Sequence, residues 1–99
     1  MLLNEPLNIA HRLEREAHRQ LQINQPEKAI LSYESAATHF DQTAQNLQNE
    51  SPSVSVQVIQ TLLLQKKNCL TEIERLKARI ADFSRTETLL SNKTMSHGL

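Results

Sequence analysis

The amino-acid sequence predicts an all-α fold, a three-helix bundle in which an antiparallel helical hairpin is followed by a longer third helix. The 99 residues include only one Gly and three Pro, too few turn residues for an all-β fold of this length. Leu, Ala, Gln, Glu, Lys and Arg, which favour helices, are abundant. Each proline precedes an amphipathic stretch, and proline is tolerated at the first helical position because its missing N–H would have no partner there. The prolines therefore mark three helix starts.

The first helix is predicted over residues 6–23, beginning at Pro6. Asn4 precedes this proline and belongs to the residue types that cap helix N-termini. Apolar residues then recur at steps of three or four, the period of one helix face: Leu7, Ala10, Leu13, Ala17 and Leu21.

The second helix is predicted over residues 26–48, beginning at Pro26 after a turn at Asn24-Gln25. Glu27 places negative charge in the first turn, where the helix dipole favours it. Small residues in its apolar face allow two helix axes to approach to the near end of their usual separation of about 8–10 Å. This face comprises Ala29, Ile30, Tyr33, Ala36, Ala37, Phe40, Ala44 and Leu47.

The third helix is predicted over residues 52–83, with Ser51 capping a start at Pro52. Leu63 and Leu70 widen its apolar stripe. At 1.5 Å per residue it would span about 48 Å, against about 27 and 35 Å for the first two helices. Its last turns, from about Leu76 to Phe83, should therefore project into solvent or meet a partner. Its heptad-like seam comprises Ile59, Leu62, Lys66, Cys69, Ile73, Leu76, Ile80 and Phe83, with Lys66 as the one polar member.

The apolar period is lost from Ser84 onward, where Ser, Thr and Asn alternate with isolated leucines. This composition predicts a disordered tail over residues 85–99 and confines the bundle to residues 1–84.

Charge and hydropathy exclude several classes of protein. Residues 1–50 carry four Lys/Arg and seven Asp/Glu, and residues 51–99 carry seven and four. Nucleic-acid binding is not expected, because a phosphate-binding surface needs clustered basic residues. No apolar run is long enough to span a membrane, and the N-terminus lacks the basic and apolar regions of a secretory signal. We therefore expect a cytoplasmic protein without membrane insertion, and the single cysteine fits a reducing compartment.

No arrangement of reactive residues predicts an enzyme, a cofactor site or a metal site. His11 and His18 share one side of the first helix, but two turns separate them, about 10.5 Å. That spacing is too wide for one zinc ion, so the histidines are interpreted as solvent-facing. Cys69 falls in the seam, where a thiol is inert filler. A phosphate-binding loop would need more than one glycine.

Two apolar residues lie off the predicted core faces and are candidate partner contacts. Leu31 lies opposite the centre of the second helix's apolar face, and Ile9 lies about 100° from that of the first. By contrast, the run from Ile59 to Leu63 has the pattern of a leucine motif that enters nuclear-receptor grooves. Because Ile59 and Leu62 belong to the core seam, we expect that motif to be buried.

Ala29, Tyr33 and Ala36 match half of a tetratricopeptide-repeat motif. A hairpin of this kind followed by one long helix resembles the microtubule-interacting and trafficking (MIT) domain, a bundle also similar to a spectrin repeat. The most similar branch is the nuclear receptor-binding factor 2 family. The motifs that carry this resemblance are Pro6-Leu7-Asn8-Ile9-Ala10-His11, Glu27-Lys28-Ala29-Ile30, Leu62-Leu63-Leu64-Gln65, Lys66-Lys67 and Glu74-Arg75.

The resemblance implies a regulatory subunit that docks onto the class III phosphatidylinositol 3-kinase complex in autophagy and is recruited to autophagosomal or endosomal membranes. We expect a partner helix to lie in a groove between two helices of the bundle, with Val58, Gln65, Lys66 and Glu72 on one wall. Two alternatives stay open. The same fold could bind tail helices of the membrane-scission (ESCRT-III) machinery, or the end of the third helix could form a coiled-coil homodimer.

Overall fold

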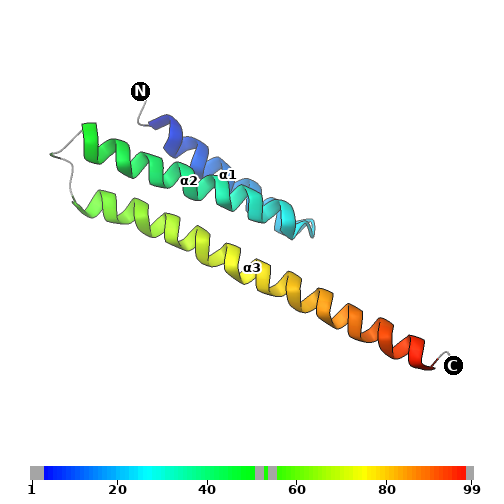
Figure 1. Ribbon diagram of the computed structural model, residues 1–99. Helices are drawn as coiled ribbons and strands as arrows, with labels where there is room; N and C mark the ends of the chain where they lie inside the picture. Colours follow the sequence, from blue (N-terminus) through cyan, green and yellow to red (C-terminus); the bar gives the residue numbers. More distant parts are fainter. Residues whose placement is uncertain (1–3, 51–52, 54–55, 98–99) are drawn as a thin grey trace.

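The computed structural model describes the backbone of residues 4–50, 53 and 56–97, and the side chains of residues 5–50, 53 and 56–86. This part of the chain forms three helices, α1 (Asn4–Gln22), α2 (Pro26–Glu50) and α3 (Val56–His97), and contains no strand. In Figure 1, α1 and α2 lie side by side as a hairpin, and α3 runs along them and far beyond their end. The predicted all-α three-helix bundle is confirmed.

Helix starts agree with the prolines only in part. α2 begins at Pro26, as predicted. α1 begins at Asn4, so Asn4 is already helical and Pro6 lies in the first turn, where its missing N–H still breaks no hydrogen bond. The start predicted for the third helix, at residue 52 with its Ser51 cap, lies outside the described residues; residue 53 lies in a turn, and α3 as described begins at Val56.

The predicted helix end at residue 83 is wrong, and so is the predicted disordered tail as far as residue 97. α3 continues without a break to His97, past the predicted boundary at residue 84, while residues 98 and 99 lie outside the described part. Neither proline nor glycine occurs between Val56 and His97. Ser, Thr and Asn each cost less than about 1 kcal/mol in a helix relative to Ala, so they weaken the helix without ending it.

The α1–α2 turn is a Schellman motif. Asn24 has a φ of 60°, in the left-handed region that asparagine tolerates better than most residues. The Gln25 N–H donates to the Gln20 carbonyl at 2.8 Å, and the Asn24 N–H donates to the Leu21 carbonyl at 3.1 Å. The Gln25 carbonyl then accepts the Ala29 N–H at 3.1 Å, which caps α2. The chain thus reverses within a few residues, and α1 and α2 are antiparallel.

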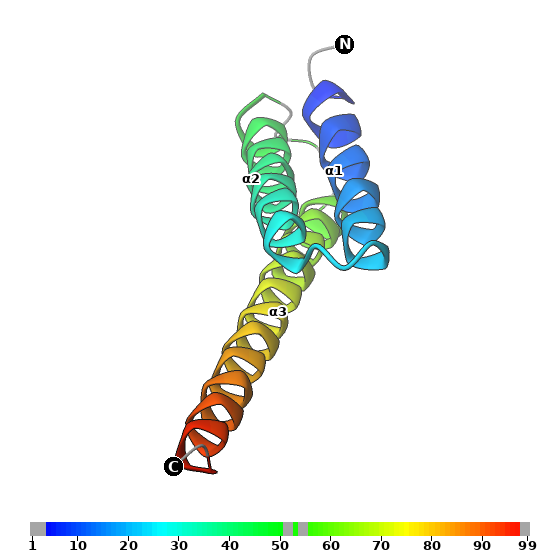
Figure 2. The same cartoon turned by 90° about the vertical axis from the view of Figure 1, so that its right-hand side faces the viewer.

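α2 is the central helix of the bundle. It packs against both α1 and α3, whereas no Cα of α1 lies within 8 Å of a Cα of α3 in the described part of the chain. Figure 2 shows α1 and α2 side by side, with the first turns of α3 behind the pair and the rest of α3 extending beyond it. Ala10 and Ala17 of α1 and Ala29 and Ala36 of α2 are fully buried, as expected where small residues let two helices approach closely.

The seam of α3 packs on the hairpin as predicted over most of its length. Leu62, Cys69, Ile73 and Leu76 are buried, and Ile59 and Ile80 are partly buried against the core. The predicted widening of this stripe is not seen, because Leu63 and Leu70 are exposed.

The projecting part of α3 begins later than predicted. Leu76, placed by the sequence in the projecting turns, is only 1% exposed, because α3 still lies against the hairpin there. Phe83, predicted as a seam residue, is 70% exposed because the hairpin has ended. Lys66, the polar member of the seam, donates from Nζ to Asp41 Oδ1 of α2 at 2.9 Å.

Candidate docking groove

A groove lies between α1 and α3, which both run antiparallel to α2 and do not pack closely on each other. One cavity of about 420 Å³ occupies it. Glu14, His18 and Leu21 of α1 form one wall, and Asn68, Cys69, Glu72 and Arg75 of α3 form the other. Tyr33 of α2 forms the floor. We call this the α1–α3 groove.

The α1 wall is held in place by two histidines that contact aromatic rings of α2. The His11 ring meets the Phe40 ring edge-on, with centroids 5.3 Å apart and an interplanar angle of 78°. His18 meets Tyr33 in the same way, at 6.0 Å and 68°. The interpretation of these histidines as solvent-facing is therefore incomplete. The two histidines are seven residues apart on α1, and the two aromatic residues are seven apart on α2. Both ring pairs therefore lie on the same side of the hairpin.

His39 also has a specific contact, since its Nδ1 hydrogen-bonds to the Ser35 carbonyl of its own helix at 2.7 Å. The side chain of His97 lies outside the described residues.

Glu14 lies on the α1 wall of the groove. Its Oε1 bonds to His11 Nδ1 at 3.2 Å, and its Oε2 accepts from the Cys69 thiol at 3.9 Å. Only 25% of its side chain is exposed. No Lys or Arg among the described side chains forms an ion pair with it. The partly desolvated carboxylate of Glu14 is thus bonded to an imidazole and a thiol, and not to a permanent cation.

Tyr33 is 4% exposed, yet it lines the groove. Burial raises the pKa of its hydroxyl, and the charges of Glu72, Cys69 and Glu14 raise it further. Glu14 of α1 and Glu72 of α3 line the same cavity as Tyr33. The Tyr33 hydroxyl makes no hydrogen bond to another described residue, and its oxygen is not fully buried.

The predicted partner residues fall on different surfaces. Glu72 lines the groove, where Arg75 pairs with it. Gln65 and Val58 precede Glu72 by two and four helical turns and therefore lie on the same side of α3. Gln65 is half-buried, and Val58 is exposed.

The other three predicted residues are not brought to this groove. Lys66 points to α2 and pairs with Asp41. Leu31 is exposed on the outer side of α2, and Ile9 is half-buried on α1. Glu14 and Tyr33 were missed from the sequence, because an isolated carboxylate and a core aromatic carry no signal before the helices are packed.

A second cavity, of about 490 Å³, lies where α3 leaves the hairpin. Leu21, Pro26, Leu76, Ile80 and Phe83 supply its apolar lining, and Asn24, Glu27, Arg79 and Ser84 complete it. It was not predicted, because its shape depends on where the hairpin turn meets α3.

Cys69 is buried behind Glu14. Burial, and next the Glu14 carboxylate, raise the pKa of its thiol from 9.0 to about 11. At pH 8 we expect iodoacetamide to alkylate Cys69 in the native protein at least about 100-fold more slowly than in the urea-unfolded chain, since the thiolate fraction falls tenfold per pKa unit.

The same shift predicts how stability depends on pH. Because the folded pKa is raised, the contribution of this thiol to stability is complete below pH 9 and is lost as the pH rises to about 11.

For the alkylation experiment, equal rates in the native protein and in the urea-unfolded chain would contradict the buried position of the Cys69 thiol.

Among the described residues, no three His, Cys, Asp or Glu side chains are grouped as a metal site, and no helix is long and apolar enough to cross a membrane. No protein-family model, curated protein or solved structure matches the chain. The family resemblance therefore rests on the sequence motifs alone.

Proposed function

We propose that the chain is a non-enzymatic protein-docking module and that a helical segment of a partner lies in the α1–α3 groove. The observation that carries this proposal is the groove itself: no Cα of α1 lies within 8 Å of a Cα of α3 among the described residues, and the two helices leave between them a cavity with Tyr33 of α2 at its floor. Amphipathic helices bind in such grooves with their apolar face inward. Val58, Gln65 and Glu72 would line the α3 side of the bound segment.

For the partner, we propose the class III phosphatidylinositol 3-kinase complex, with this chain as a regulatory subunit in autophagy. The support is the resemblance of Pro6–His11 and Glu27–Ile30 to the MIT domain of the nuclear receptor-binding factor 2 family. A cytoplasmic module of this kind would reach autophagosomal or endosomal membranes through its partner.

The test is pull-down of the purified lipid-kinase complex by the immobilised chain, with Gln65→Trp as the blocking variant. The indole would occupy the groove side of α3, and we expect at least about a tenfold loss of affinity, equivalent to about 1.4 kcal/mol. Gln60→Trp is the matched control, because Gln60 is exposed and lies about 140° around α3 from Gln65. Circular dichroism should show both variants folded.

Two results would contradict the proposal. Equal capture by the chain and by Gln65→Trp would place binding outside the groove. Saturable, Gln65-dependent binding of ESCRT-III tail peptides without capture of the kinase complex would assign the groove to the membrane-scission machinery instead.

A second candidate function is dimerisation through the projecting part of α3. The observation that favours it is the exposed Phe83 on a helix that continues to His97, beyond the hairpin. A helix end of this kind can pair with a second copy as a coiled coil. Sedimentation equilibrium should then show a dimer that Phe83→Asp dissociates, and a monomer throughout the micromolar range would exclude this function.

A further inference from the structure

The charge inside the α1–α3 groove is not balanced at neutral pH. Glu14 and Glu72 face the cavity with one guanidinium, that of Arg75, and Arg75 is already paired with Glu72. His18 also lines the cavity, and His11 bonds to Glu14 from the same helix. Glu14 is therefore the negative group without a permanent cation, in a position that is three-quarters removed from solvent.

Tyr33 provides an independent indication of a ligand. Its side chain is almost fully buried and lines the cavity, yet its hydroxyl has no hydrogen-bond partner among the described residues. No fully buried side-chain N or O atom of the described residues lacks a hydrogen bond, so this hydroxyl is accessible from the cavity and can bond to a polar ligand there. Its position between Glu14 and Glu72 favours a ligand that donates hydrogen bonds.

We propose that the part of the groove formed by Glu14, Tyr33 and Glu72 receives the cationic end of a Lys or Arg side chain from the partner helix. This inference rests on the proposed function. The ammonium or guanidinium group donates to the Glu14 carboxylate and to the Tyr33 hydroxyl oxygen. The aliphatic part of the side chain packs along Leu21 and the Tyr33 ring. The partner is thus an amphipathic helix with one basic residue within its apolar face.

Other side chains fit this position less well. A carboxylate from the partner would be repelled by Glu14 and Glu72. An apolar side chain would remove water from Glu14 without replacing its interactions, and an unpaired buried charge is strongly unfavourable. A Lys or Arg side chain has both the length to reach the cavity floor and a charge that is compensated there.

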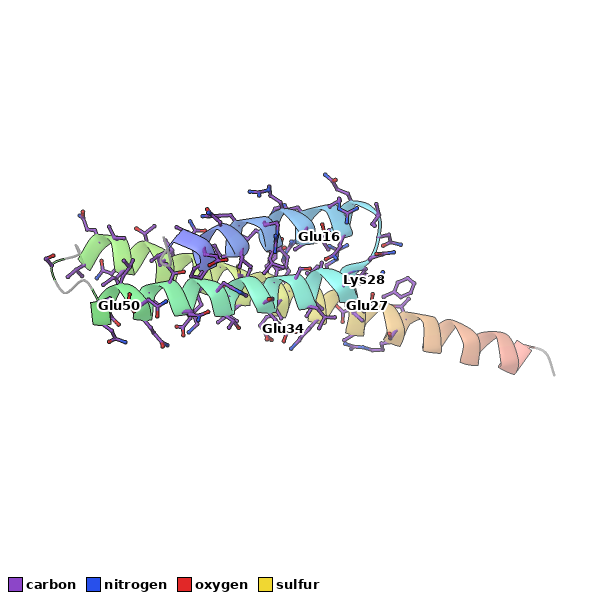
Figure 3. The ribbon with its side chains drawn as sticks, turned by 90° about the horizontal axis from the view of Figure 1, so that it is seen from above. Glu16, Glu27, Lys28, Glu34 and Glu50 are labelled. Atoms are coloured by element: carbon purple, nitrogen blue, oxygen red, sulfur yellow. The ribbon has the colours of Figure 1, made fainter. Side chains whose placement is uncertain are left out.

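The test is selection of helix-forming peptides from a randomised phage-displayed library against the whole chain, with Glu14→Gln as the variant. Glu16→Gln is the matched control, because it removes the same charge two residues away on α1. Figure 3 labels Glu16 on α1, and its carboxylate is already paired with Arg19. Glu27, Glu34 and Glu50, also labelled there, are exposed carboxylates of α2.

We expect one position of the selected helices to be enriched in Lys or Arg with the unchanged chain and with Glu16→Gln, and this enrichment to vanish with Glu14→Gln. For one selected peptide, changing that Lys to Gln should weaken binding at least about tenfold to the unchanged chain but no more than about twofold to Glu14→Gln.

The library could instead yield peptides whose binding is blocked by Gln65→Trp but in which no position is enriched in Lys or Arg. That result would overturn the inference while supporting the docking function. Failure to select any peptide that Gln65→Trp blocks would overturn both. The inference would also be overturned if the basic residue of the peptide contributed equally to binding of the unchanged chain and of Glu14→Gln, because its cation would then lie away from Glu14.

Discussion

Replacing Phe40 by alanine is expected to destabilise the fold by about 3–5 kcal/mol, the range for truncating a fully buried phenylalanine. Phe40 is 0% exposed and lies at the middle of α2, the helix on which the other two pack. Its ring also receives the edge of His11. Because small domains have only about 5–15 kcal/mol of stability, this change should leave much of the population unfolded near physiological temperature. Urea denaturation followed by circular dichroism measures it.

The matched control is Phe83→Ala, which removes the same side chain from the exposed turn beyond the hairpin. Substitutions at such positions change stability by no more than about 0.5 kcal/mol. If the two variants had similar urea midpoints, Phe40 would not be the centre of the core.

The second large effect is expected for Leu76→Ala, which should cost about 2–5 kcal/mol through lost burial and the cavity left behind. Leu76 is among the largest fully buried side chains and fixes α3 against the turn end of the hairpin. The control is Leu64→Ala, because Leu64 is 55% exposed on the same helix. Thermal unfolding of the two variants compares them directly.

This comparison also decides how far the bundle extends. A large loss at Leu76 with little change at Leu64 agrees with a core that reaches the α1–α2 turn. A small loss at Leu76 would instead mean that α3 separates from the hairpin before this residue.

Local sequence signals predict the helices more reliably than their ends. The steps of three and four through Leu7–Leu21 and Ala29–Leu47 identify α1 and α2, because one buried helix face imposes that period. The end of α3 was missed, because a loss of apolar period indicates that a helix no longer packs, not that it stops.

The candidate site could be predicted only in outline. Val58, Gln65 and Glu72 were placed on one wall as residues off the core seam of the third helix, and that seam is a property of α3 alone. Which of the off-core residues face a groove depends on the direction from which α1 approaches. Lys66 illustrates this, because it belongs to the same predicted set but faces α2, where Asp41 holds it.

The sequence by itself therefore determined that this chain is helical, that its helices form an alanine-rich hairpin and one long third helix, and most of the residues that are buried. These properties follow from propensity and periodicity, which act over a few neighbouring residues. Only the tertiary structure decided that α2 is the central helix and that, in the described part of the chain, no Cα of α1 lies within 8 Å of a Cα of α3. It also placed Glu14 of α1, Tyr33 of α2 and Glu72 of α3 around one cavity. The physical reason is that this cavity is made by residues from three helices, and no local pattern specifies how helix axes cross.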